Sequence, residues 1–174
     1  MSEKKAWVGI ILGSASDWPV MEPAATLLDD WGVGVEVLVA SAHRSPRRVE
    51  TYAREAAARG LKVLIAAAGH AAHLAGVVAA HTTLPVVGVP IPSSDLKGLD
   101  SLLAMVQMPP GVPVATMAIG AAGARNAAIF AVQVLALEDE RLQQRLAQHK
   151  EEQAKGVEKQ QEKIPAMYHP ASLG

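Results

Sequence analysis

The stretch VGVEVLVASAHRSP, residues 33–46, gives the clearest indication of the fold. Its first part, residues 33–40, is mostly apolar and rich in β-branched valine, which predicts a buried strand. Ser45 and Pro46 then predict the start of a helix, with serine as the N-cap and proline in the first turn. The stretch therefore indicates a strand that leads directly into a helix, the basic unit of an α/β fold.

Three polar side chains, Ser41, His43 and Arg44, lie between this strand and this helix. In open α/β sheets, ligands bind where strands end and helices begin. Histidine exchanges protons near neutral pH, and arginine binds phosphate through two parallel hydrogen bonds. The segment therefore predicts part of a binding site, although an ordinary solvated loop would also be polar.

Apolar runs of strand length alternate with helical patterns along the chain. The expected strands are residues 7–12, 33–40, 61–67, 86–89 and 114–117, and the expected helices are residues 17–31, 46–59, 72–80, 99–106 and 124–137. Strands that are apolar on both faces are typical of a parallel sheet covered on both sides. Right-handed crossovers then predict a three-layer α-β-α sandwich. The short chain favours the flavodoxin-like strand order over a dinucleotide-binding fold.

The composition changes after residue 137. Residues 138–163 are rich in Glu, Gln, Lys and Arg, with Leu142 and Leu146 among few apolar positions. This pattern predicts an extra C-terminal helix that is exposed or rests on a neighbouring subunit. Residues 164–174 are expected to form a tail. With 174 residues, the chain is expected to form a single domain, 1–174, whose core spans residues 6–137.

Charge and composition exclude several classes of partner. A formal net charge of −1 gives no electrostatic reason for binding nucleic acid or an anionic membrane. There is no cysteine, and therefore no thiol nucleophile or disulfide. The apolar runs are too short to span a bilayer, and residues 1–5 lack a signal-peptide core. We therefore expect a soluble cytoplasmic protein. Abundant alanine and glycine favour close helix packing, also between subunits, which predicts a homo-oligomer.

A second polar loop, GSASD at residues 13–17, follows the first expected strand. Its small residues let backbone N–H groups approach a phosphate at a helix N-terminus, and Ser14 and Ser16 add hydroxyl donors. Asp17 suits the hydroxyls of a ribose. The spacing matches neither a Walker loop nor the dinucleotide fingerprint, and simple capping by Ser16 or Asp17 is the structural alternative.

A third loop, residues 67–74, follows the third expected strand. The small residues Ala68 and Gly69 leave room for a planar ring against the backbone. His70 and His73 are three residues apart, but no third ligand is near in sequence, so we predict no metal site and give His73 a hydrogen-bonding role. Together the three loops offer phosphate donors, a ribose acceptor, a titratable histidine and a slot for a ring, which predicts binding of a nucleotide-like monophosphate.

The chain resembles the N5-carboxyaminoimidazole ribonucleotide mutases, the catalytic-subunit type of phosphoribosylaminoimidazole carboxylase in purine synthesis. The resemblance covers most of residues 7–137 in the same order. The matching stretches are GSASDWPVM (13–21), SAHRSP (41–46), AGHAAHLAGVVAAHTTLPVVGVP (68–90), GLDSLLAMVQMPPGVPVATMAIG (98–120) and GARNAA (123–128).

The resemblance implies a flavodoxin-like homo-octamer that moves a carboxylate from N5 to C4 of the aminoimidazole ring without metal, ATP or organic cofactor. It further implies that His43 transfers protons and that the ribonucleotide is held by other pocket residues. These are Ser14, Asp17 and Arg44 as direct ligands, with Ser16, Ser41 and the backbone of Ala68 and Gly69 lining the same pocket. We also expect His73 to contribute to substrate binding.

The chain departs from the family pattern at three positions. The family commonly has glycine at the position of His70, proline at Ala75 and serine at Ala104. His70 would lie beside the ring, where it could alter pocket shape, protonation or activity. Two alternative functions stay open: a carboxylase that uses free CO2 with aminoimidazole ribonucleotide, and a non-catalytic nucleotide-binding module. A flavodoxin-type electron carrier is disfavoured, because few aromatic residues are placed to stack on a flavin.

Overall fold

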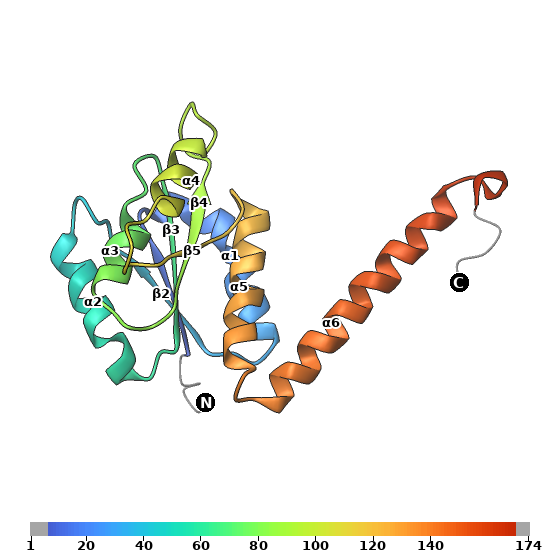
Figure 1. Cartoon of the computed structure of the whole chain (residues 1–174), viewed down its shortest axis with the longest axis horizontal. Coiled ribbons are helices and arrows are strands. Elements are labelled where there is room, and N and C mark those ends of the chain that lie inside the picture. Colours follow the sequence, from blue (N-terminus) through green and yellow to red (C-terminus); the bar gives the residue numbers. More distant parts are fainter. Residues whose placement is uncertain (1–6, 170–174) are drawn as a thin grey trace.

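The computed structural model describes residues 7–169, and its sheet has five parallel strands (Figure 1). They are β1 (Val8–Leu12), β2 (Val35–Val39), β3 (Val63–Gly69), β4 (Val86–Ile91) and β5 (Ala115–Thr116). The order β2-β1-β3-β4-β5 is that of flavodoxin, which confirms the expected fold class. Residues 1–6 and 170–174, which include the end of the expected tail, lie outside the described residues.

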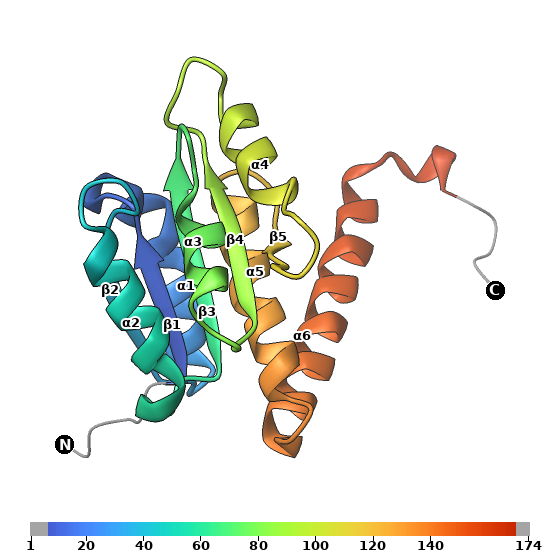
Figure 2. The same ribbon diagram turned by 60° about the vertical axis from the view of Figure 1, so that its left-hand side comes forward.

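Helices cover both faces of the sheet (Figure 2). One face packs against α1 (Trp18–Asp30) and α5 (Ala121–Leu135), and the other against α2 (Pro46–Arg59), α3 (Leu74–Ala80) and α4 (Leu99–Val106). Each face has its own cluster of buried side chains, and alternate residues of the strands contribute to the two clusters. The three-layer sandwich is therefore confirmed.

The edge strand β2 differs from the expectation of a strand buried on both faces. Val37 and Val39 are 43% and 44% exposed, whereas every residue of β1 and β4 is buried. The reason is position: β2 is the outermost strand of the sheet, and these two valines are not covered by a helix of this chain. The strand also spans 35–39, shorter than the expected 33–40.

The start of α2 is partly as predicted. Pro46 occupies the first turn, the helix has the expected bounds, and Gly60 ends it in the left-handed conformation. Ser45 stands at the N-cap position, but its side chain makes no capping hydrogen bond. Instead the Ser45 hydroxyl accepts a hydrogen bond from the N–H of Ser41 at 2.9 Å and donates one to its carbonyl at 3.2 Å. This serine therefore closes the loop after β2 and does not cap the helix.

The C-terminal helix α6 (Glu140–Glu158) projects away from the sandwich (Figure 1). Its N-cap, Asp139, accepts a hydrogen bond from the N–H of Leu142, and the Leu142 side chain is fully buried in the core beside α1 and α5. From Lys150 onward the helix is exposed on every side. It ends before two short 3-10 turns, and no helix within residues 7–169 is long and apolar enough to cross a bilayer.

Candidate active site

A pocket of about 400 Å³ lies at the carboxyl ends of β1, β2, β3 and β4. The three polar loops that the sequence singles out converge there because parallel strands end at the same edge of the sheet. All the residues nominated from sequence and resemblance line this pocket: Ser14, Ser16, Asp17, Ser41, His43, Arg44, Ala68, Gly69 and His73. His70 and Ser93 line it as well.

The loop after β1 is held by hydrogen bonds among its own residues. The Asp17 carboxylate accepts a hydrogen bond from the N–H of Ser14 at 3.1 Å, and the Ser14 hydroxyl accepts one from the N–H of Ser16 at 3.3 Å. The two serine hydroxyls are themselves 2.8 Å apart. This capping box sets the first helical turn, but its N-cap is Ser14, not the expected Ser16 or Asp17. Asp17 takes part through its hydrogen bond to Ser14, and both serines line the pocket.

Asp17 is a buried carboxyl group, only 5% exposed, at the floor of this loop. Burial raises its pKa, while the hydrogen bond from Ser14 and the electrostatic influence of His70 and Arg44 act in the opposite direction. One carboxylate accepts several hydrogen bonds, so Asp17 keeps capacity for hydroxyl groups of a ligand after binding the Ser14 N–H.

Arg44 connects the loops after β1 and β2. Its guanidinium donates a hydrogen bond to the carbonyl of Gly13 at 3.3 Å, and its backbone N–H donates one to the Ser41 hydroxyl at 3.2 Å. The side chain is exposed to solvent within the pocket. This arrangement holds a permanent positive charge next to the serines of the β1 loop, which suits a phosphate group.

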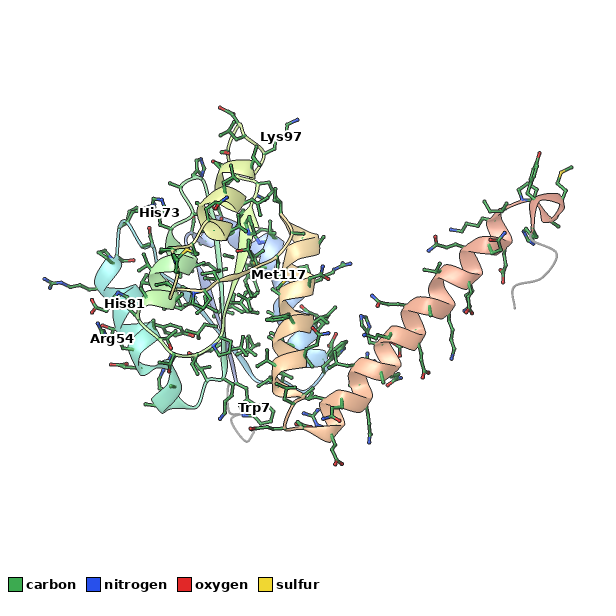
Figure 3. All side chains as sticks on the ribbon, in the orientation of Figure 1. Trp7, Arg54, His73, His81, Lys97 and Met117 are labelled. Atoms are coloured by element: carbon green, nitrogen blue, oxygen red, sulfur yellow. The ribbon has the colours of Figure 1, made fainter. Side chains whose placement is uncertain are left out.

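His43 and His73 form a pair across the pocket. Nε2 of His43 lies 2.8 Å from Nδ1 of His73, and the two rings meet edge to face at 82°. One facing nitrogen must donate and the other accept, so there is room for a single proton between the rings. Figure 3 labels His73 near the end of the sheet opposite Trp7. The sequence analysis names both residues, but nothing in the sequence indicates that their side chains touch.

His70 and His73 do not converge on a common point. His73 bonds to His43, whereas Nδ1 of His70 lies 2.9 Å from the hydroxyl of Ser93. Within residues 7–169, no group of three or more His, Asp or Glu side chains is arranged to hold a metal ion.

The sequence analysis nominated neither Ser93, which lines the pocket, nor Ser101, which hydrogen-bonds to the backbone of His70. Ser101 is fully buried and its hydroxyl is shared between the carbonyls of His70 and Ile91. The expected end of the fourth strand, residue 89, is two residues too early, because Pro90 interrupts the apolar pattern. The proline is tolerated in the strand, and the Ser93 loop therefore reaches the same edge as the other three loops.

Comparisons with known proteins agree with this geometry. A family model for AIR carboxylase matches residues 7–156. The N5-carboxyaminoimidazole ribonucleotide mutase of Vibrio parahaemolyticus is 54% identical over 150 residues, covering 86% of this chain and 93% of that protein. The enzyme of the same name from Pyrococcus horikoshii is 47% identical over 167 residues, covering 96% and 93%. The crystal structure of Treponema denticola PurE superposes with a TM-score of 0.81 at 26% identity, over 90% of this chain and 97% of the other. On the family match and these identities, the chain belongs to the AIR carboxylase family.

Proposed function

We propose that this protein is an N5-carboxyaminoimidazole ribonucleotide mutase of de novo purine biosynthesis. It would move the carboxylate from N5 of the substrate to C4, forming 4-carboxy-5-aminoimidazole ribonucleotide. The observation that carries the proposal is the His43–His73 pair, which lies in one pocket with Arg44 and the buried Asp17. The names of the relatives from Vibrio and Pyrococcus support the same reaction.

Each part of the ribonucleotide has a matching group in the pocket. Arg44, Ser14 and Ser16 offer a cation and hydroxyl donors to the phosphate. The Asp17 carboxylate accepts hydrogen bonds from the ribose hydroxyls. We place the aminoimidazole ring beside the backbone at 68–69, which lines the pocket together with Ser41.

The reaction needs one proton to be delivered and one to be collected. Protonation of N5 breaks its bond to the carboxylate and releases CO2, which a small pocket holds near the ring. C4 then attacks CO2, and the resulting C4–H proton must leave to restore the aromatic ring. A single imidazole performs both transfers and returns to its starting state, and we assign this role to His43. Holding CO2 and ring together supplies much of the remaining rate.

His73 gives His43 a defined tautomer in this scheme. If Nε2–H of His43 donates to Nδ1 of His73 throughout, the proton that is exchanged with the ligand is carried on Nδ1 of His43. The His43–His73 hydrogen bond then stays the same before and after each transfer. We therefore treat His73 as a positioning residue that also lines the pocket.

An isotope experiment tests the proposal against both alternatives. The purified protein is given N5-carboxyaminoimidazole ribonucleotide labelled with carbon-13 in its carboxylate, without ATP and with excess unlabelled bicarbonate. A mutase transfers the label to C4, and the product retains most of it. A carboxylase that uses free CO2 would give a product diluted to the label content of the bicarbonate. Binding without turnover would identify a non-catalytic module, and either result would refute the proposal.

We also propose that the protein works as a symmetric homo-oligomer, an octamer by resemblance, in the cytoplasm and without a cofactor. Two features support assembly. Leu99, Leu103 and Val106 on α4 are each about half exposed, and the outer half of α6 extends away from the body, with no packing partner among residues 7–169 (Figure 1). Half-exposed apolar side chains such as those on α4 are typical of contacts between subunits, and a projecting polar helix can rest on a neighbouring subunit. Light scattering at micromolar concentration checks this, and a monomer would contradict it.

A further inference from the structure

His70 is a pocket residue that the proposed mechanism does not use. We propose that His70 binds the carboxylate of the ribonucleotide and so gives the pocket a preference for carboxylated over non-carboxylated ligands. This inference rests on the proposed function, because it concerns the same ligand. It follows from how His70 is held, from which ring nitrogen is available, and from where the residue lies along the sheet.

His70 is held at both its backbone and its side chain. Its φ of +54° lies in the left-handed region, which is unfavourable for a residue with a Cβ. Ser101 donates a hydrogen bond to the His70 carbonyl, and Ser93 contacts the ring at Nδ1. A Cβ on the preceding Gly69 would overlap the Ser93 hydroxyl, so the two loops are in direct contact. A backbone held in this region by its surroundings is a common feature of ligand-binding sites.

The hydrogen bond to the Ser93 hydroxyl occupies Nδ1 of His70 and leaves Nε2 as the ring nitrogen that can face a ligand. We assign Ser93 as the donor to Nδ1 when the ring is neutral. The ring proton is then on Nε2. If the ring becomes cationic, Ser93 accepts from Nδ1 and Nε2 still carries a proton. In both states His70 offers an Nε2–H donor, and a carboxylate is the complementary acceptor.

The position of His70 along the sheet distinguishes the two anionic groups of the ligand. Arg44 bonds to Gly13 at the ends of β1 and β2, whereas His70 bonds to Ser93 at the ends of β3 and β4. Neighbouring strands are about 4.8 Å apart, so these two groups lie at opposite ends of the pocket. Asp17 follows β1, which lies between β2 and β3 in the sheet, so it stands between Arg44 and His70. If Arg44 binds the phosphate and Asp17 the ribose, the carboxylated ring extends toward His70.

The test compares the affinities of two ligands for His70→Gly. Glycine adopts a positive φ without strain, so this variant removes the imidazole and keeps the backbone. Lys97→Gly is the matched control: Lys97 has a φ of +53° but lies at the tip of the loop before α4, outside the pocket (Figure 3). Isothermal titration measures binding of 4-carboxy-5-aminoimidazole ribonucleotide and of 5-aminoimidazole ribonucleotide, which lacks the carboxylate.

A hydrogen bond to a charged group contributes about ten- to a hundredfold in affinity. We therefore expect His70→Gly to lower the affinity for the carboxylated ligand at least tenfold and for the non-carboxylated ligand less than threefold. Lys97→Gly should bind both ligands with wild-type affinity. Ser93→Ala should reduce the same preference, and adding it to His70→Gly should cause no further loss, because Ser93 acts through the imidazole.

Each other outcome has a distinct meaning. If the wild-type protein binds both ligands and His70→Gly changes the carboxylated one less than threefold, the role of His70 is refuted and the proposed function stands. If His70→Gly lowers the affinity for both ligands equally, His70 contacts the part that they share, and the inference is again wrong. If the wild-type protein binds neither ribonucleotide, the proposed function fails, and the His70 inference fails with it.

Discussion

His43→Asn separates catalysis from folding, because the side chain is exposed and, within the described part of the chain, makes one side-chain hydrogen bond, to His73. Such a bond contributes about 0.5–1.5 kcal/mol to stability. In a protein of this size, 1 kcal/mol shifts Tm by roughly 2–4 °C, so we expect Tm to change by no more than about 6 °C. Asparagine has a similar size and can still hydrogen-bond, so assembly and ligand binding should persist.

The expected loss of turnover is much larger. A general acid–base group contributes typically 10²–10⁴-fold, and asparagine cannot carry a proton at neutral pH. Each tenfold loss corresponds to about 1.36 kcal/mol, so the activation free energy should rise by roughly 2.7–5.4 kcal/mol. The effect on turnover therefore exceeds any effect on stability that the single hydrogen bond could cause.

The assay measures kcat by absorbance, ligand affinity by titration calorimetry and Tm by calorimetry, all on the same preparation. His81→Asn is the control, because His81 lies at the C-terminal end of α3 and does not line the pocket. We expect a kcat at least a hundredfold lower for His43→Asn and an unchanged kcat for His81→Asn. Near-normal turnover by a folded, assembled His43→Asn protein would refute the mechanism and direct attention to His70 or His73.

Three further predictions concern binding and stability. Arg44→Ala and Ser14→Ala should raise the Kd for the ribonucleotide more than they lower kcat. For Arg44→Ala the loss of binding free energy should be about 1.5–3 kcal/mol, and unchanged affinity in both variants would contradict the phosphate assignment. Asp17→Asn should bind the ribonucleotide less well but unfold at a higher temperature than wild type at pH 7, an advantage that shrinks as pH falls through the raised folded-state pKa of Asp17 toward 3.8. Leu142→Ala should lower the free energy of unfolding in urea by about 2–5 kcal/mol at fixed protein concentration, because its side chain is fully buried; a change below 1 kcal/mol would show that α6 is not docked through it.

The sign of the Asp17 prediction follows from its pKa. Burial raises the folded-state pKa above the unfolded value, so the folded state favours the protonated carboxyl. This contribution to stability is fully present below the pKa of the unfolded state and is lost as pH rises through the pKa of the folded state. Asparagine stays neutral at every pH and avoids the loss, which differential scanning calorimetry between pH 3 and pH 7 measures.

Much of the fold follows from local patterns in the sequence. The alternation of apolar strands with helices, and the bounds of α2 and α4, are as predicted, because periodicity and end signals such as Pro46 and Gly60 act over a few residues. The same patterns place three polar loops at strand ends, and parallel strands bring such ends to one edge. The location of the pocket was therefore predictable from the sequence alone.

Only the tertiary structure decided which of these side chains touch. The His43–His73 contact joins residues thirty positions apart, and the His70–Ser93 contact joins residues twenty-three apart, so no local pattern encodes either. Burial is also a property of the whole: β2 is half exposed because it is an edge strand, and Leu142 is buried because α6 begins beside α1 and α5. Local propensity acts along the chain, whereas contacts and burial depend on segments that only folding brings together.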